Sequence, residues 1–336
     1  MPRSKLNSSI TRASRLAALV LGSVALGGCG GGGGSDPETG SLSVNLTDAP
    51  VDGAASVVVV FTGLELQRAN GTAVSLDFGT TNGQANTKSI DLIKLQNGVT
   101  GALTDGAAVP AGDYQWMRLK VLADKNSQGE SYITLLNGAQ YPLYIPSGAE
   151  TGLKLVRPFT VAQGSTTRLV VDFDLRKSVR APPGQDPNYV LKPTLRLMDQ
   201  LQVGKITANV DLAALTATQL GSSASISSCK AGLYLFSGAA AVPDDADGDS
   251  TDGADPIVFM PIVYDGINTT VQVSIPFIEA GSYTVAATCN FDVDSPDSND
   301  YVATATAGQP GYQTMKWTTV GNVSVMTGNT ATVAVP

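Results

Sequence analysis

The feature that most constrains the fold of this chain is a succession of short runs in which apolar and polar residues alternate. Turn signals interrupt these runs about every eight to twelve residues, which is typical of β-sandwiches. No amphipathic helix longer than two turns is expected. The fold class predicted is all-β, with two antiparallel β-sandwich domains, the second of them immunoglobulin-like or transthyretin-like. The expected strands span residues 42–46, 57–66, 114–122, 153–161, 167–175, 189–197, 205–210, 231–236, 257–264, 270–275, 282–288, 323–326 and 330–335.

The distribution of charge supports a division into two domains. Residues 40–202 contain 14 basic and 14 acidic residues, whereas residues 203–336 contain 3 and 13. We therefore expect a neutral domain over 41–198, a linker over 199–204 and an acidic domain over 205–336.

The first residues of the chain resemble the processing site of a bacterial lipoprotein. An apolar stretch at 16–26, too short to span a bilayer, leads to the small residues Gly27 and Gly28 and then to Cys29. By this resemblance 1–28 is a signal peptide, and Cys29 carries a diacylglyceryl group and a third acyl chain. The alternative is an ordinary secretory signal beside an incidental cysteine. Four basic residues precede the apolar stretch: Arg3, Lys5, Arg12 and Arg15.

The segment after Cys29 favours a tether. Residues 29–40 have no large apolar side chain to bury, so we expect a lipidated cysteine followed by a flexible Gly-rich connection. In the lipoproteins that this segment resembles, aspartate after the cysteine retains the protein at the inner membrane. Gly30 stands there in this chain, which favours the outer membrane of the cell envelope, with the leaflet left open.

Composition excludes several classes of chemistry. The chain has no histidine, which removes Ser-His-Asp and Cys-His catalysis and histidine-ligated zinc. The signal holds four of the 21 basic residues and none of the 29 acidic ones, which leaves a net charge of −12 for the mature chain. Nucleic acid is therefore not expected as a partner.

Two cysteines remain after lipidation. Because the chain folds outside the reducing cytoplasm, we expect Cys229 and Cys289 to form a disulfide. Two buried free thiols are the alternative.

Six sequence blocks, in order over about 160 residues, resemble the bacterial lipoprotein domain known as domain of unknown function 4382. The resemblance implies a β-sandwich on secreted or lipidated envelope proteins, and it brings no catalytic residues. The acidic domain lies outside it. The blocks are GSLSVNLTD at 40–48, IDLIKLQNG at 90–98, VPAGDYQWMRLKV at 109–121, IPSGAETGLKL at 145–155, VVDFDLRKSV at 170–179 and YVLKPTLRL at 189–197.

The acidic domain contains two clusters of oxygen-bearing side chains, the ligands that Ca²⁺ prefers. Neither cluster follows the EF-hand pattern, so calcium is a hypothesis of composition, and two solvated acidic loops are the alternative. Two separate sites, or none, are expected rather than a single shared ion. The candidate ligands are Asp245, Asp247, Asp249 and Asp252 in the first cluster and Asp292, Asp294, Asp297 and Asp300 in the second.

Asp172 and Asp174 allow two interpretations. Alternation along 169–176 places both on the polar face of a strand, where a neighbouring strand at 114–121 would offer Arg118 and Lys120 for a cross-strand charge ladder. Alternatively, the two carboxylates lie about 7 Å apart, the spacing of an inverting glycosidase pair.

Taken together, these features predict a lipid-anchored, non-catalytic module of the cell envelope. It would bind a protein, glycan or matrix ligand, with Ca²⁺ as its only candidate cofactor. A hydrolase that uses carboxylates or a metal is one alternative. A passive component of an envelope assembly is the other.

Overall fold

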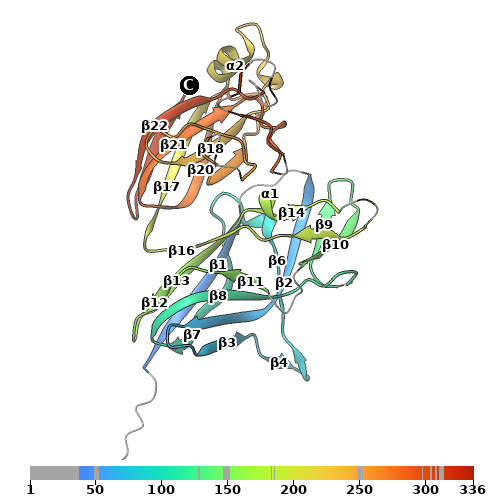
Figure 1. The fold of residues 1–336 in the computed structure, drawn as a ribbon, viewed down its shortest axis with the longest axis vertical. Helices are drawn as coiled ribbons and strands as arrows, with labels where there is room; N and C mark the ends of the chain where they lie inside the picture. Colours follow the sequence, from blue (N-terminus) through green and yellow to red (C-terminus); the bar gives the residue numbers. More distant parts are fainter. Residues whose placement is uncertain are drawn as a thin grey trace, which may run out of the picture. The chain divides into compact units, whose positions relative to one another are not determined.

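The computed structural model describes residues 38–48, 53–127, 129–146, 152–182, 184, 186–248, 251, 253–296, 298–302, 305–306, 309 and 314–336. By its contacts the chain from Pro37 to Pro336 forms one compact unit. Figure 1 shows the chain as a series of β-sheets with few and short helices. We refer to residues 39–199 as the N-terminal β-region and to residues 203–335 as the C-terminal β-region.

The strands of the N-terminal β-region include most of those expected, together with several that the sequence pattern left out. Its helical turns are η1 (Leu92–Leu95) and α1 (Leu175–Ser178). Its strands are β1 (Thr39–Asp48), β2 (Ala54–Arg68), β3 (Ala73–Asp77), β4 (Thr80–Thr81), β5 (Gln84–Ala85), β6 (Lys88–Asp91), β7 (Gly101–Pro110), β8 (Gly112–Leu122), β9 (Tyr132–Leu135), β10 (Gln140–Tyr144), β11 (Leu153–Leu155), β12 (Phe159–Val161), β13 (Thr166–Phe173), β14 (Val179–Arg180), β15 (Tyr189–Leu191) and β16 (Leu195–Asp199).

The C-terminal β-region has fewer strands and one longer helix. Its helical segments are α2 (Leu212–Leu220) and η3 (Ile226–Ser228). Its strands are β17 (Val203–Asp211), β18 (Gly232–Ser237), β19 (Val258–Pro261), β20 (Thr270–Glu279), β21 (Gly281–Thr288), β22 (Thr318–Val325) and β23 (Thr330–Val335).

The predicted all-β class is confirmed, and the sheets are mostly antiparallel. The N-terminal β-region has a sheet in the order β16-β13-β1-β7 and a larger sheet with the path β11-β8-β2-β9-β10-β15-β14. The C-terminal β-region has the sheets β20-β17-β23 and β19-β18-β21-β22. Three pairs are parallel, namely β1 with β13, β10 with β15 and β17 with β23.

Each β-region has its own hydrophobic core, and strands at the centre of a sheet contribute to it with alternate residues. In β13, Leu169, Val171 and Phe173 enter the N-terminal core. In β18, Leu233 and Leu235 enter the C-terminal core. The division into two domains stays a prediction, although the two cores fall on either side of the expected linker.

Two predicted strands are each divided in two at a proline. The run at 153–161 forms β11 and β12, with Pro158 just before β12, and the run at 189–197 forms β15 and β16, with Pro193 between them. Proline has no N–H to donate to a neighbouring strand, so the ladder stops there.

The predicted charge ladder is wrong. Strand β8 pairs with β2, β11 and β12, whereas β13 pairs with β1 and β16. Arg118 of β8 instead pairs with Glu65, its cross-strand neighbour on β2, at 3.2 Å, and Lys120 pairs with Asp77 on β3 at 2.8 Å.

Helix α2 is nine residues long and exceeds the two turns allowed by the sequence analysis. Its buried positions are Leu212, Leu215, Thr216 and Gln219, a helical spacing in which two of four residues are polar. The apolar pattern is therefore too weak to reveal the helix. Asp211 begins it by accepting hydrogen bonds from the N–H groups of Ala213 and Ala214, both at 3.0 Å.

The signal peptide, Cys29 and nearly all of the tether lie outside the described residues. Within the described ranges, no helix has both the length and the apolar character that crossing a membrane requires.

Candidate functional site

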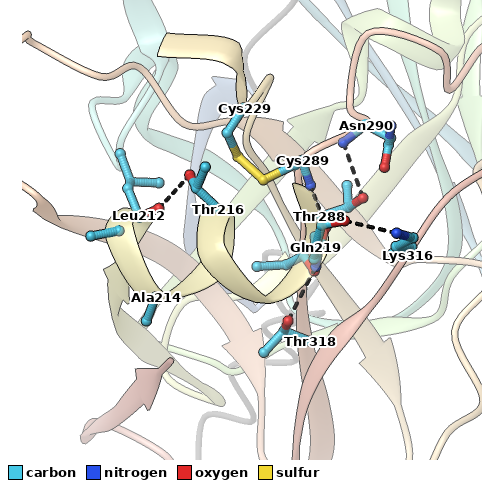
Figure 2. Close-up of a disulfide and its surroundings, with 12 residues drawn as sticks. Leu212, Ala214, Thr216, Gln219, Cys229, Thr288, Cys289, Asn290, Lys316 and Thr318 are labelled. Carbon is cyan, nitrogen blue, oxygen red and sulfur yellow. Dashed lines mark hydrogen bonds between the residues drawn. A yellow bond between two sulfur atoms is a disulfide. The ribbon is translucent and has the colours of Figure 1, made fainter. Parts of the chain in front are cut away.

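The disulfide between Cys229 and Cys289 is confirmed, with 4.5 Å between the two Cα atoms (Figure 2). It joins the start of β18 to the end of β21, which are antiparallel neighbours with Gly232 opposite Thr288. The bond closes a loop of 60 residues. The chain-entropy relation gives such a loop about 4 kcal/mol of stabilisation. The disulfide thus fixes the point from which the second acidic cluster departs.

Gln219 connects helix α2 to the chain around the disulfide through hydrogen bonds (Figure 2). Its Nε2 donates to the carbonyl oxygen of Ala287 and to Oγ1 of Thr318, both at 3.1 Å. Its Oε1 accepts from the N–H of Cys289 at 2.8 Å. A buried amide with all of these bonds stabilises one arrangement of the chain around the disulfide.

The described parts of the two acidic clusters contact each other, while the expectation of two separate ion sites, or none, stays a prediction. We define the first acidic loop as residues 244–255 and the second as residues 290–301. Oδ2 of Asp245 accepts hydrogen bonds from the N–H groups of Asp300 at 2.5 Å and Tyr301 at 3.2 Å. The N–H of Ala246 donates to Oδ1 of Asp294 at 3.2 Å. Ala246 of the first loop packs in one cluster with Tyr234 and Phe236 of β18, a contact that the sequence pattern does not indicate.

Asp294 is buried at the centre of this contact, with 2% of its surface exposed. Its Oδ2 accepts from the hydroxyl of Tyr234 at 2.5 Å. Burial raises the pKa of Asp294, against the lowering effect of Tyr234, Ala246 and Arg176. The same burial, together with the carboxylate of Asp294, raises the pKa of Tyr234. Asp294 therefore acts as a structural acceptor between the two loops.

Asp245 has less compensation for its burial than Asp294 has. The residue is fully buried, and among the described residues Oδ1 has no hydrogen-bond partner. Burial, aided by the charges of Asp247 and Asp294, raises the pKa of Asp245 to about 7. An unpaired buried oxygen of this kind is costly unless a proton or a cation neutralises it.

The other predicted ligands are less well placed for a shared ion. Asp247 is half-buried, and Asp292 is exposed. Asp300 accepts from the N–H of Ser295 at 2.8 Å and from Oγ of Ser298 at 2.9 Å. Among the described residues, no three His, Cys, Asp or Glu side chains are grouped so that they could hold a metal ion. Asp249, Asp252 and Asp297 lie outside the described residues.

An aromatic cluster lies beneath the two loops, on the face of β18 that points away from the C-terminal core. Tyr234 is at its centre, with ring centroids 5.8 Å from Phe259, 5.8 Å from Phe291 and 4.8 Å from Trp317. Both faces of β18 are therefore covered, which explains its nearly continuous apolar sequence. The acidic loops pack on a rigid apolar base.

A basic segment of the N-terminal β-region also contacts the second acidic loop and the residue that follows the first loop. Arg176 donates to the carbonyl oxygen of Asp294 at 2.6 Å. Lys177 donates to that of Pro256 at 3.2 Å, and Arg180 to that of Pro296 at 3.3 Å. The sequence analysis missed these contacts. The signal available was three cations within five residues of an otherwise neutral region, followed in the chain by a strongly acidic one.

The carboxylates proposed for a hydrolase have structural roles. Asp172 forms an ion pair with Arg196, its cross-strand partner on β16. Burial raises the pKa of Asp172 against the lowering effect of Arg196. Asp174 lies beyond the end of β13 and accepts from the N–H of Lys177 at 3.1 Å, which begins helix α1. The cavity beside Asp172 measures about 20 Å³, room for about one water molecule.

Residues 39–193 match the family described as Domain of unknown function (DUF4382). The match starts with β1 and ends after β15, so it covers most of the N-terminal β-region and none of the acidic loops. No curated protein matches the chain.

Two solved structures show a weak likeness. GBS52, the minor pilin of the gram-positive pathogen Streptococcus agalactiae, has 10% identity and a TM-score of 0.17, over 88% of this chain and 94% of that chain. A point mutant of the major pilin of Streptococcus pyogenes has 10% identity and a TM-score of 0.13, over 88% and 99%. Likenesses of this degree carry no argument about function.

Proposed function

We propose that this protein is a lipid-anchored, non-catalytic module of the bacterial cell envelope that binds a protein, glycan or matrix ligand. The observation that carries the proposal is that three aspartates, which could serve as catalytic acids or bases, each make structural contacts. Asp172 pairs with Arg196, Asp174 begins a helix and Asp294 joins two loops. General acid–base chemistry requires such groups to reach a substrate, whereas Asp172 and Asp294 are buried and the half-buried Asp174 is engaged at the start of the helix.

A direct comparison of binding and turnover tests this proposal. The purified protein is incubated with envelope polysaccharides and with chromogenic esters, and in parallel it is immobilised and exposed to the same polysaccharides and to solubilised envelope proteins. We expect saturable binding and intact substrate. Turnover that disappears when Asp172 and Asp174 are both changed to Asn, in a variant that still folds, contradicts the proposal and supports a hydrolase. Recovery of one constant stoichiometric partner without ligand binding favours a passive assembly role.

The membrane anchor is part of the proposal and has its own test. Lipidation at Cys29 is supported by the basic and apolar segments before it and by the disulfide, which suits an oxidising compartment. Cells that express the chain are labelled with palmitate, and their membranes are fractionated. We expect the label and the outer-membrane location in the wild type and their loss in Cys29→Ser. A Cys29→Ser protein that remains with the membrane contradicts the lipid anchor.

Calcium is proposed to neutralise Asp245 and so to stiffen the acidic loops. The proposal is supported by the buried Oδ1 of this residue, although the described residues do not form a complete ligand set. The melting temperature is measured in excess chelator and in millimolar CaCl₂. We expect a rise of several degrees with calcium in the wild type and none in Asp245→Asn, because only native-state binding stabilises. Equal melting temperatures in the two media contradict a calcium site.

A further inference from the structure

The side chain of Arg176 leaves helix α1 of the N-terminal β-region and enters the aromatic cluster of the C-terminal β-region. Its guanidinium carbon lies 4.0 Å from the ring centroid of Phe291 and 5.0 Å from that of Phe259. Only 11% of the side chain is exposed. The cation is therefore held against two aromatic rings and largely removed from water, where cation–π contacts are strongest.

The nitrogens of the same guanidinium group lie close to carbonyl and carboxylate oxygens of the second acidic loop. One terminal nitrogen donates to the carbonyl oxygens of Asp294 at 2.6 Å and Phe291 at 3.3 Å. The other lies 3.7 Å from Oδ2 of Asp294, whose side chain is fully buried. Asp294 thus supplies both a carbonyl oxygen and a negative charge to one arginine.

This arrangement suits a guanidinium better than an ammonium ion. A guanidinium is planar, with weakly hydrated faces that stack on rings and five N–H groups around its edge. An ammonium ion is compact, strongly hydrated and without a flat face. Lys177 shows the contrast within the same helix, because it reaches one carbonyl oxygen at 3.2 Å and one ring centroid at 5.2 Å.

We propose that Phe259, Phe291 and Asp294 form a guanidinium-binding site in the C-terminal β-region, and that Arg176 is its ligand within the same chain. The inference goes beyond the proposed function, because it concerns how the family domain holds the acidic loops and not what the protein binds outside itself. Arg176 supplies the positive charge for Asp294 that a metal ion would otherwise bring. Arg176 then fixes the second acidic loop at Asp294, whereas calcium is proposed at Asp245 of the first loop.

The proposal is tested by removing the ligand and adding it back. The full chain carrying Cys29→Ser, which avoids the lipid, is prepared with Arg176→Ala, and its melting temperature is measured with increasing methylguanidinium. Methylammonium at the same ionic strength is the chemical control. Lys177→Ala is the matched variant, because it removes a cation that contacts only one ring of the site and leaves Arg176 in place.

We expect Arg176→Ala to lower the melting temperature by at least about 5 °C, and millimolar methylguanidinium to restore most of that loss with saturation. Methylammonium should restore little, and Lys177→Ala should not respond to either cation. A variant that melts like the parent overturns the proposal. So does equal rescue by both cations, or equal rescue of Arg176→Ala and Lys177→Ala.

A binding signal independent of melting comes from Trp317, whose ring belongs to the same aromatic cluster. The chain has two tryptophans, so Trp116→Phe leaves Trp317 as the only indole fluorophore. Methylguanidinium should change this fluorescence with saturation in Arg176→Ala and leave it unchanged where Arg176 is present. A change of equal size in both overturns the proposal.

If Arg176→Ala does not fold, Arg176→Lys and Arg176→Gln take its place. A guanidinium site predicts that the lysine variant loses nearly as much melting temperature as the glutamine variant, although it keeps the charge. A lysine variant that melts like the parent overturns the proposal, because charge alone then suffices.

Discussion

At the scale of single residues, the buried aspartates Asp245 and Asp294 of the C-terminal β-region differ in their surroundings. Asp294 receives hydrogen bonds from Tyr234 and Ala246 and the charge of Arg176. Asp245 receives two backbone N–H groups on one oxygen only. Because charge compensation decides the protonation state of a buried carboxylate, Asp245 should respond to pH or to a cation more readily than Asp294.

The pKa of Asp245 predicts the direction of a pH effect. Its rise from 3.8 to about 7 means that the folded state holds this proton more tightly than the unfolded state. The contribution of this group to stability is therefore fully present below about pH 4 and is lost as the pH rises through about 7. In chelator, we expect the melting temperature of the wild type to fall between about pH 5 and about pH 8 relative to Asp245→Asn. Parallel pH profiles for the two proteins contradict this prediction.

The ion pair between Asp172 and Arg196 yields a second residue-scale prediction. Arg196→Ala leaves a buried carboxylate without its cation, so we expect a loss of about 2–4 kcal/mol in the free energy of unfolding, measured with denaturant. The added change Asp172→Asn should recover part of that loss, because it removes the unpaired charge. If the double variant is no more stable than Arg196→Ala, the carboxylate is not the source of the cost.

At the scale of secondary-structure elements, helix α2 owes its place to polar contacts. Gln219 holds the helix to Ala287, Cys289 and Thr318 through its side-chain amide. These bonds explain why a helix with so weak an apolar pattern packs against β21. Strands β1 and β8 differ from this helix, because the alternation of apolar and polar residues is enough to identify them.

Replacing Gln219 by Leu tests the role of this amide. The change keeps a side chain of similar volume but leaves the N–H of Cys289 without its acceptor, so we expect a loss of about 1–3 kcal/mol in the free energy of unfolding. Amide hydrogen exchange at Cys289 should accelerate as well. Thr318→Val is the control, because it removes a single bond. An equal loss in the two variants contradicts a special role for the amide.

Strand β13 ends two residues earlier than the strand predicted at 167–175. Alternation correctly places Leu169, Val171 and Phe173 in the core, yet the strand ends before Asp174. Asp174 accepts a backbone N–H three residues later, which is a local alternative to strand pairing. The pattern of apolar residues cannot show which of the two the chain takes.

At the scale of the whole molecule, the disulfide and the Arg176 contact both hold the second acidic loop. The disulfide fixes the chain before the second acidic loop, and Arg176 binds the carbonyl oxygens of Phe291 and Asp294 within it. The second acidic loop is therefore held at its start by the disulfide of the C-terminal β-region and at Phe291 and Asp294 by Arg176 of the N-terminal β-region.

Removal of the disulfide should have a large effect on the whole unit. For Cys229→Ser with Cys289→Ser we expect a loss of about 4 kcal/mol in the free energy of unfolding, from the 60 residues that the bond encloses. Denaturant unfolding with and without reductant provides the measurement. Reductant should destabilise the wild type and leave the double variant unchanged. A wild type that is indifferent to reduction would show that the bond contributes little.

The sequence by itself determined the all-β class, the pairing of Cys229 with Cys289 and the family match of residues 39–193, because each rests on local alternation, on a count of cysteines or on ordered blocks. Only the tertiary structure decided that the two acidic loops meet, that Asp172 pairs with Arg196 and that Arg176 lies between two phenylalanine rings. The physical reason is distance along the chain. Asp245 and Asp300, or Arg176 and Asp294, are joined by strand order and loop paths, which no local pattern of residues encodes.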